Sequence, residues 1–298
     1  MTRDTPALLV TCAIPAELEQ LLSAEFPLIR SVPEGGPLPE VAVTTSMAGF
    51  TAAQMAELPD LKLILCNGTG LDRIDLAAAE ARGIRVVNTP DAVTEDTADT
   101  AIALTYALLR RTVEADRFVR DGRWGPERFG PGRRIKGSRI GIVGPGRIGQ
   151  RVAERAAALE MEVAYTARAQ KDLPWRFLPS LTALADWADV LVLCVPGGPE
   201  TQHLITAEVL SALGPEGYLI NIARGSVVDE AALIHALQSG GIAGAGLDVF
   251  ATEPAPDPRF AALTNTVLQP HSAAITRETR RDIAQTLLQA ARDWCAGR

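Results

Sequence analysis

Cysteine, histidine and lysine are scarce in this chain of 298 residues, and the first two shortages exclude particular kinds of site. The four cysteines, Cys12, Cys66, Cys194 and Cys295, form no Cys-x-x-Cys pair, so we expect free thiols rather than disulfides or a redox motif. The three histidines include no pair at metal-ligand spacing, which predicts a protein without a structural metal.

Long apolar runs and an excess of positive charge are also missing. No segment has the length of a membrane span, and the polar start at residues 1–5 is unlike a signal peptide, so we expect a cytoplasmic protein with no membrane partner. Acidic residues outnumber basic ones by 36 to 29, giving a net charge of −7. This balance argues against nucleic acid as a partner, and the basic run at 133–136 is too short to reverse it.

The chain alternates short apolar strands with helical patterns, which predicts an α/β fold with parallel sheets covered on both faces. At 47% hydrophobic residues, a chain of this length can bury more than one core, and we expect two domains. The expected strands are 7–11, 41–44, 61–66, 84–87, 139–143, 162–165, 190–195, 218–222, 245–247 and 266–268. A long helix is expected over 94–120, and a Gly- and Pro-rich segment at 121–132 marks a boundary.

A glycine-rich turn follows the strand at 139–143. Its spacing, Gly-x-Gly-x-x-Gly, permits a tight turn, a close approach of main chain to phosphates, and close packing of strand on helix. The turn consists of Gly144, Gly146 and Gly149, with the main-chain N–H groups of Arg147 and Ile148 as the expected pyrophosphate donors. Glycine triplets also occur in ordinary turns, but the helical pattern and the strand at 162–165 complete a βαβ unit and favour a dinucleotide site.

Two cations stand where the next strand ends. An acidic residue at this place would bond the ribose hydroxyls of NAD, but the chain has Arg168 and Lys171 instead. Both would attract a 2′-phosphate, the arginine through a planar fork and the lysine as a point charge. We therefore predict NADPH as the preferred cofactor and NADH as the alternative, against the simpler interpretation of two solvated residues on a loop.

Three polar residues follow later strands of the same predicted sheet. These are Arg224, Glu253 and His271. Each has a structural alternative: the arginine could tie a turn, the carboxylate could cap the segment at Pro254, and the histidine could be buried. Because the carboxyl ends of parallel strands share one edge of the sheet, we expect the three to meet there.

Together the three residues supply what reduction of a carbonyl requires. Hydride transfer builds negative charge on the oxygen, and Arg224 is suited to bind that oxygen together with a substrate carboxylate. His271 is the candidate general acid in reduction and general base in the reverse direction. Glu253, bonded to the imidazole, would orient the ring and stabilise its protonated form.

These motifs resemble the ordered signatures of the D-isomer-specific 2-hydroxyacid dehydrogenases. The resemblance covers most of the chain and is greatest for the glyoxylate/hydroxypyruvate reductase branch, including the related hydroxyphenylpyruvate reductases. The segments that carry it are residues 67–72, 83–94, 144–149, 194–201, 221–230, 247–254 and 269–271. Pro145 departs from the family pattern, which more often has a flexible apolar residue there, but the expected donors are the next two N–H groups.

The resemblance implies two Rossmann-like or flavodoxin-like domains, with a cofactor domain (94–276) inserted into a discontinuous substrate domain (1–93 and 277–298). It implies Arg224, Glu253 and His271 as the catalytic residues and a homodimer joined through 94–132. The further residues that it implies are Gly68, Thr69 and Gly70 for the substrate carboxylate, Thr97 and Asp248 near the nicotinamide, and Cys194, Pro196 and Ala223 in the cofactor site.

The expected activity is NAD(P)H-dependent reduction of small 2-keto acids, glyoxylate or hydroxypyruvate, to D-2-hydroxy acids. Several alternatives stay open: a reductase of bulkier acids such as hydroxyphenylpyruvate, a phosphonate dehydrogenase-like enzyme, or a corepressor-like NAD(H) sensor. A formate dehydrogenase-like enzyme would replace the carboxylate by an amide, and Glu253 argues against it.

Overall fold

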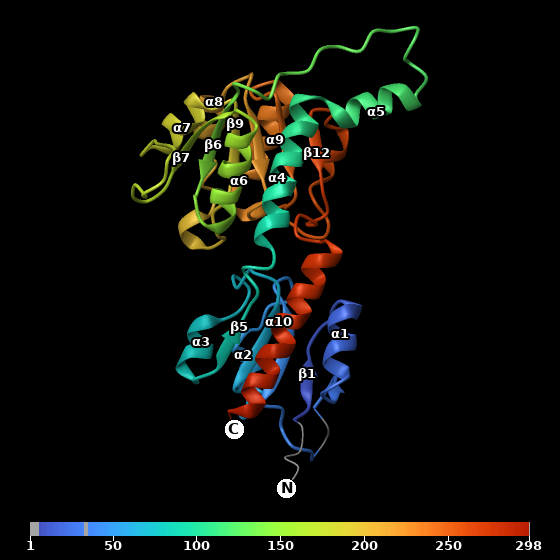
Figure 1. Ribbon diagram of the computed structural model, residues 1–298, viewed down its shortest axis with the longest axis vertical. Coiled ribbons are helices and arrows are strands. Elements are labelled where there is room, and N and C mark those ends of the chain that lie inside the picture. Colours follow the sequence, from blue (N-terminus) through green and yellow to red (C-terminus); the bar gives the residue numbers. More distant parts are fainter. Residues whose placement is uncertain (1–5, 33–34, 298) are drawn as a thin grey trace. The chain divides into compact units, whose positions relative to one another are not determined.

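The computed structural model describes residues 6–32 and 35–297, and the polar start predicted at 1–5 lies outside them. The chain divides into two compact units, residues 1–93 with 275–298 and residues 94–274 (Figure 1). Each unit contains one sheet in which every pairing is parallel. This confirms the predicted α/β fold with parallel sheets.

The first unit is built on a five-stranded sheet of order β2-β1-β3-β4-β5. Its strands are β1 (Leu8–Val10), β2 (Leu28–Ile29), β3 (Val41–Thr45), β4 (Leu63–Asn67) and β5 (Arg85–Val87). Its helices are α1 (Ala16–Ser23), α2 (Ala52–Ala56), α3 (Leu76–Ala81) and the C-terminal α10 (Arg277–Ala296). The two-residue strand β2 was not predicted, because so short a segment has no measurable apolar period.

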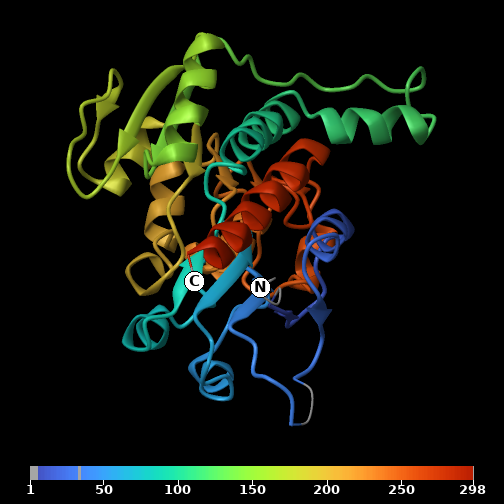
Figure 2. The same cartoon turned by 60° about the horizontal axis from the view of Figure 1, so that its bottom comes forward.

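Helices cover both faces of this sheet. Leu9, Ala42 and Ile64, which are aligned across three neighbouring strands, pack with Met55 of α2 and Ala79 of α3. Successive side chains of a strand point to opposite faces, so the other buried residues of these strands face the opposite side. There α10 crosses the sheet and packs on β4 and on α1 (Figure 2).

The second unit is built on a seven-stranded sheet of order β12-β11-β10-β9-β6-β7-β8. The strands are β6 (Arg139–Val143), β7 (Glu162–Thr166), β8 (Arg176–Phe177), β9 (Val190–Leu193), β10 (Tyr218–Asn221), β11 (Gly244–Leu247) and β12 (Thr266–Leu268). The chain moves from β6 to β7 on one side and then returns to place β9 on the other. This reversal between β6 and β9 is the place where open sheets of this type bind ligands, beyond the carboxyl ends of the strands.

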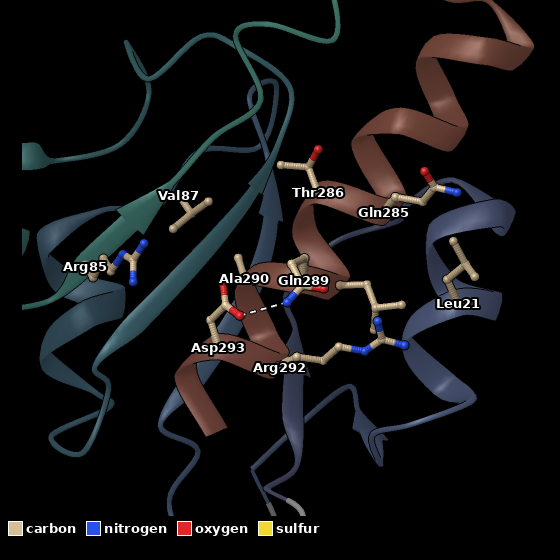
Figure 3. A pocket seen from close by; sticks show the side chains of 10 residues that line it. Leu21, Arg85, Val87, Gln285, Thr286, Gln289, Ala290, Arg292 and Asp293 are labelled. Atoms are coloured by element: carbon tan, nitrogen blue, oxygen red, sulfur yellow. Dashed lines mark hydrogen bonds between the residues drawn. The ribbon is translucent and has the colours of Figure 1, made fainter. Parts of the chain in front are cut away.

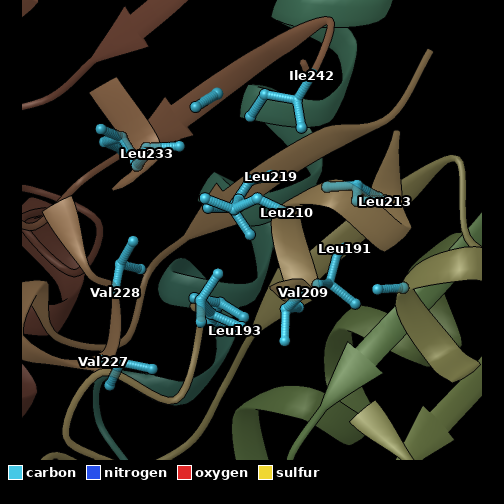
Figure 4. Packing of buried hydrophobic residues seen from close by; sticks show 14 of the residues in the cluster. Leu191, Leu193, Val209, Leu210, Leu213, Leu219, Val227, Val228, Leu233 and Ile242 are labelled. Carbon is cyan, nitrogen blue, oxygen red and sulfur yellow. The ribbon is translucent and has the colours of Figure 1, made fainter. Parts of the chain in front are cut away.

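Two hydrophobic cores lie on opposite faces of the seven-stranded sheet. One contains Leu191, Leu193 and Leu219 and the helices α7 (Leu181–Trp187), α8 (Ala207–Leu213) and α9 (Glu230–Ser239) (Figure 4). The other contains the alternate residues Val190, Val192 and Ile220 and the helices α4 (Thr94–Leu109) and α6 (Arg147–Ala158). The period of two along each strand therefore divides its side chains between the two cores.

The single long helix predicted over 94–120 is wrong, because the chain forms α4 and a separate α5 (Thr112–Arg120). Arg111 between them adopts a left-handed backbone with φ of 53°. Its guanidinium pairs with Glu114 and lies 4.7 Å from the centre of the Phe129 ring. No glycine or proline marks this break in the sequence, which is why a pattern of apolar residues could not locate it.

Among the described residues, none of the helices combines the length and the apolar composition that crossing a bilayer requires. Within the same part of the chain, the His, Cys, Asp and Glu side chains form no group of three or more that could hold a metal ion. The four cysteines are free thiols.

Candidate active site

The glycine turn connects β6 to α6 and has the shape of a cradle for a dinucleotide. Gly144 has φ of 86°, a region that favours glycine. A Cβ on Gly149 would lie 2.4 Å from the carbonyl oxygen of Gly144, whereas a Cβ on Gly146 would meet nothing within 4 Å. The third glycine is thus required for packing, and the second leaves the main chain open to a bound group. The turn fits a pyrophosphate at the start of α6, where first-turn N–H groups have no intrahelical partner.

Arg168 and Lys171 follow β7, on the next strand of the sheet. The Arg168 side chain is 93% exposed, and its Nη1 lies 3.3 Å from Glu200 Oε2. Lys171 Nζ instead donates to the carbonyl oxygen of Pro145 in the glycine turn, at 3.0 Å. The two cations therefore occupy different environments, although both lie beside the expected adenosine end of the cofactor.

His271 and Glu253 come into direct contact after β12 and β11. His271 Nδ1 lies 2.9 Å from Glu253 Oε2, and the Glu253 side chain is only 11% exposed. The other oxygen, Oε1, accepts the N–H of Phe250 at 2.9 Å, which fixes the plane of the carboxylate. The imidazole side chain is one-third exposed. With Nδ1 bonded to the carboxylate, the ring has Nε2 available for a substrate.

A second acid, the buried Asp248 directly after β11, holds the backbone that carries His271. Its Oδ1 accepts the N–H groups of Ser272 at 2.7 Å and Ala273 at 3.1 Å, and its carbonyl oxygen accepts the N–H of His271 at 2.8 Å. Burial raises the pKa of the Asp248 carboxyl above its usual value, while the two N–H groups act in the opposite direction. These bonds maintain the left-handed backbone of His271, whose φ is 53°.

Arg224 follows β10 and starts a short 3₁₀ turn, Gly225–Val227. Its guanidinium donates from Nη1 to the carbonyl oxygen of Ala223 at 2.7 Å. A Cβ on Gly225 would lie 1.8 Å from the carbonyl carbon of Phe250. Only glycine allows this approach, so the segment that carries Arg224 packs against the segment that leads to Glu253.

Asn221 is a residue of this region that the sequence analysis missed. It is 1% exposed, its Oδ1 accepts the N–H of Ala223 at 3.0 Å, and its Nδ2 donates to the carbonyl oxygen of Arg224 at 3.0 Å. The amide thus shapes the turn before Arg224. The available signal was a polar side chain at the end of an otherwise apolar strand.

The remaining predicted residues lie in two groups. Cys194 and Pro196 follow β9, Ala223 follows β10, and Thr97 is a buried residue of α4, all within residues 94–274. The predicted carboxylate loop, Gly68 to Gly70, follows β4 in the other unit. Gly68 has φ of 123°, and Asn88 Nδ2 donates to the carbonyl oxygen of Thr69 at 2.7 Å. The role of this loop in binding a carboxylate stays a prediction.

A shallow pocket of about 780 Å³ lies elsewhere, beside α10 in the unit of residues 1–93 and 275–298 (Figure 3). It is lined by Arg85 and Val87 of β5, Leu21 of α1, and residues of α10. Gln289 Nε2 donates to Asp293 Oδ1 at 2.8 Å within its wall. None of the predicted catalytic residues lines this pocket, so it is separate from the chemistry described above.

Known proteins are similar to this chain in sequence over most of its length. The chain is 46% identical to the 2-ketogluconate reductase of Gluconobacter oxydans over 264 residues, which cover 88% of this chain and 82% of the relative. It is 41% identical to the hydroxyphenylpyruvate reductase of Plectranthus scutellarioides over 290 residues, 94% of this chain and 93% of that protein.

A solved structure and a family model also match this chain. The NADPH-dependent glyoxylate/hydroxypyruvate reductase of Sinorhizobium meliloti, solved with NADP and malonate, superposes with a TM-score of 0.92 at 36% identity, over 98% of this chain and 94% of that one. Residues 102–273 match the family model described as the NAD-binding domain of the D-isomer-specific 2-hydroxyacid dehydrogenases. This chain therefore belongs to the D-isomer-specific 2-hydroxyacid dehydrogenase family and is an oxidoreductase that uses NAD(P)H.

Proposed function

We propose that this protein reduces small 2-keto acids to D-2-hydroxy acids, with NADPH as the preferred cofactor. The observation that carries the proposal is the contact of 2.9 Å between His271 and Glu253 at the same sheet edge as the glycine turn. Arg224 follows the strand next to the one that leads to Glu253. An acid, its orienting carboxylate and an anion-binding guanidinium are thus all supplied by strand ends of one unit.

Each side chain has a defined task in the proposed reaction. His271 holds a proton at Nε2 and delivers it to the carbonyl oxygen, while Nδ1–H donates to Glu253 Oε2. The carboxylate stabilises the imidazolium before transfer and keeps the ring in one orientation. The guanidinium of Arg224 binds the substrate carboxylate and the oxygen on which negative charge develops. When bound, NAD(P)H supplies the hydride.

The substrate class can be tested with purified protein and a panel of acids. The panel would contain glyoxylate, hydroxypyruvate, 2-ketogluconate, hydroxyphenylpyruvate and phosphite, with oxidation of NADPH or reduction of NADP followed by absorbance. We expect the highest kcat/KM for glyoxylate or hydroxypyruvate. A preference for 2-ketogluconate or hydroxyphenylpyruvate would mean that the substrate is a longer keto acid. Oxidation of phosphite alone would reject the proposal that the protein reduces keto acids. Cofactor binding without turnover on any member would instead favour a sensor.

Cofactor preference should depend on Arg168. We expect Arg168→Ala to weaken NADPH binding by about 10- to 100-fold, the effect of losing one charge-assisted hydrogen bond, and to leave NADH binding unchanged. Glu200→Gln is the opposing variant, because it removes the anion 3.3 Å from the guanidinium, and it should strengthen NADPH binding. Dissociation constants from cofactor fluorescence would check both. Equal weakening of the two cofactors by Arg168→Ala would contradict the assignment.

We also propose a homodimer formed through the arm of α5 and the segment after it. Val119 is 54% exposed and Trp124 is 74% exposed, and large apolar side chains exposed on the same arm are a candidate surface for association. Phe118 packs on Phe129 at 5.3 Å, which gives the arm its own small apolar centre. Light scattering should give twice the chain mass, and Val119→Glu should give a monomer. Leu76→Glu, at another exposed apolar residue, is the matched control and should leave the mass unchanged.

A further inference from the structure

A buried phenol fixes the loop that carries the two cations. Tyr165 of β7 is 1% exposed, and its ring packs on Phe177 with 5.4 Å between centres. Its hydroxyl accepts the N–H of Lys171 and donates to the carbonyl oxygen of the same residue, both at 2.9 Å. The main chain of Lys171 is therefore tied at both polar groups to a core side chain.

The side chain of Lys171 reaches from this fixed point to the glycine turn. The carbonyl oxygen of Pro145 accepts Nζ at 3.0 Å and also accepts Nε2 of Gln150 at 3.2 Å. In the same peptide unit, the N–H of Gly146 donates to the carbonyl oxygen of Gly144 at 2.8 Å. Because a peptide unit is planar, bonds on its oxygen and its nitrogen together fix the direction of the plane.

This peptide plane leads directly into the helix that would receive the phosphates. Gly146 is the N-cap of α6, and the N–H of Gln150 closes the first helical bond onto its carbonyl oxygen at 3.0 Å. The orientation of the Pro145–Gly146 peptide therefore sets the direction in which the first-turn N–H groups point. The ammonium of Lys171 also places a positive charge beside the expected pyrophosphate.

We propose that the two cations have separate tasks. Lys171 is a positioning residue that holds the glycine turn in its dinucleotide-binding geometry through the Pro145 carbonyl, and Arg168 alone recognises the 2′-phosphate. The first task serves NADH and NADPH equally and requires only that the protein binds NAD(P)H, whereas the second rests on the proposed preference for NADPH. Lys171 was predicted from the sequence as a second phosphate ligand, and this proposal replaces that role.

The test compares dissociation constants of the whole protein for NADPH, NADH and 5′-ADP, measured by fluorescence or calorimetry without a keto acid. We expect Lys171→Met to weaken all three by about tenfold, as for loss of one hydrogen bond from a charged group, with the NADPH/NADH ratio unchanged. Arg168→Met is the matched variant and should weaken only NADPH. The different effects on 5′-ADP, which has no 2′-phosphate, separate the two tasks most directly.

Two further variants distinguish positioning from general stability. Tyr165→Phe removes both bonds to the Lys171 main chain and should weaken all three ligands in the same direction. Lys171→Arg keeps a charged donor and should retain most of the affinity. At saturating cofactor, Lys171→Met should keep kcat within about twofold while KM for the cofactor rises, because the turn binds the cofactor and does not take part in proton transfer.

Specific results would overturn the proposal. If Lys171→Met weakens NADPH but leaves NADH and 5′-ADP unchanged, the lysine is a phosphate ligand and not a positioning residue. Unchanged affinities with only a lower Tm would show that it contributes stability alone. If Arg168→Met leaves the NADPH/NADH ratio unchanged, the task assigned to that arginine is wrong, whereas the ratio measured for the unmodified protein tests the NADPH preference itself. The effect of Lys171→Met on binding of NADH and 5′-ADP tests the positioning role separately, because neither ligand has a 2′-phosphate.

Discussion

Replacing His271 by asparagine is expected to lower kcat for keto-acid reduction by about 10²- to 10⁴-fold, which is the usual contribution of a positioned general acid. Asparagine suits this position because it tolerates a left-handed backbone, and His271 has φ of 53°. The bonds from Asp248 to the following N–H groups should therefore persist. The variant removes the proton donor while the loop that carries it keeps its shape.

Cofactor binding provides the internal check on this result. The dissociation constant for NADPH should change by less than about threefold, because the imidazole follows β12, which lies four positions along the sheet from β6, the strand that leads into the glycine turn. His235→Asn, on α9, is the matched control and should keep full activity. Retention of more than about a tenth of kcat by His271→Asn would mean that another group delivers the proton. Stopped-flow kinetics with a deuterated cofactor would show whether hydride transfer itself is slowed.

Replacing Arg224 by lysine should lower kcat/KM by about 10²- to 10³-fold, the size found for loss of one donor to a developing oxyanion. The substitution keeps the charge but loses the planar fork, so one ammonium cannot bind a carboxylate and a carbonyl oxygen together. The bond from Nη1 to the carbonyl oxygen of Ala223 would also be lost, and with it the orientation of the side chain. Both effects reduce the stabilisation of the transition state, in which the carbonyl oxygen carries negative charge.

Substrate analogues without a carboxylate separate the two functions of this guanidinium. Arg224→Lys should lower kcat/KM for glyoxylate far more than for a simple aldehyde, since only the acid uses the bidentate contact. Arg259→Lys, at an exposed arginine paired with Asp257, is the control and should behave as the parent protein. Equal losses for acid and aldehyde would limit the role of Arg224 to the carbonyl oxygen. No loss with either substrate would remove it from the site.

Most of the fold was predictable from the sequence because the strands are apolar and the breaks between them are chemically marked. The strands predicted at 139–143 and 266–268 match β6 and β12, and the others differ from the structure by one or two residues at their ends. The two-residue strands β2 and β8 were missed, because they have too few residues for an alternating pattern. The break at Arg111 was missed because no glycine or proline marks it, and the contact of its guanidinium with Phe129 is not visible in the sequence.

The residues of the candidate site could be predicted from the sequence, but the contacts between them could not. Glu253 and His271 stand 18 positions apart, and only the parallel order of β11 and β12 brings them together. The contacts of Asp248 could not be foreseen, because the sequence does not show which N–H groups a buried carboxylate will accept. The same holds for Lys171, whose partner in the glycine turn lies 26 positions earlier.

The two cores of the seven-stranded sheet have an implication for how this family can diversify. The described hydrophobic residues of those cores belong mainly to the strands and helices, whereas Arg224, Glu253 and His271 each lie in a segment that follows a strand. Substitutions in the connecting loops can therefore change substrate selectivity without removing the core packing that stabilises the fold. Substitutions at other loop positions could change which acid is bound, provided that Arg224, Glu253 and His271 keep their places after β10, β11 and β12.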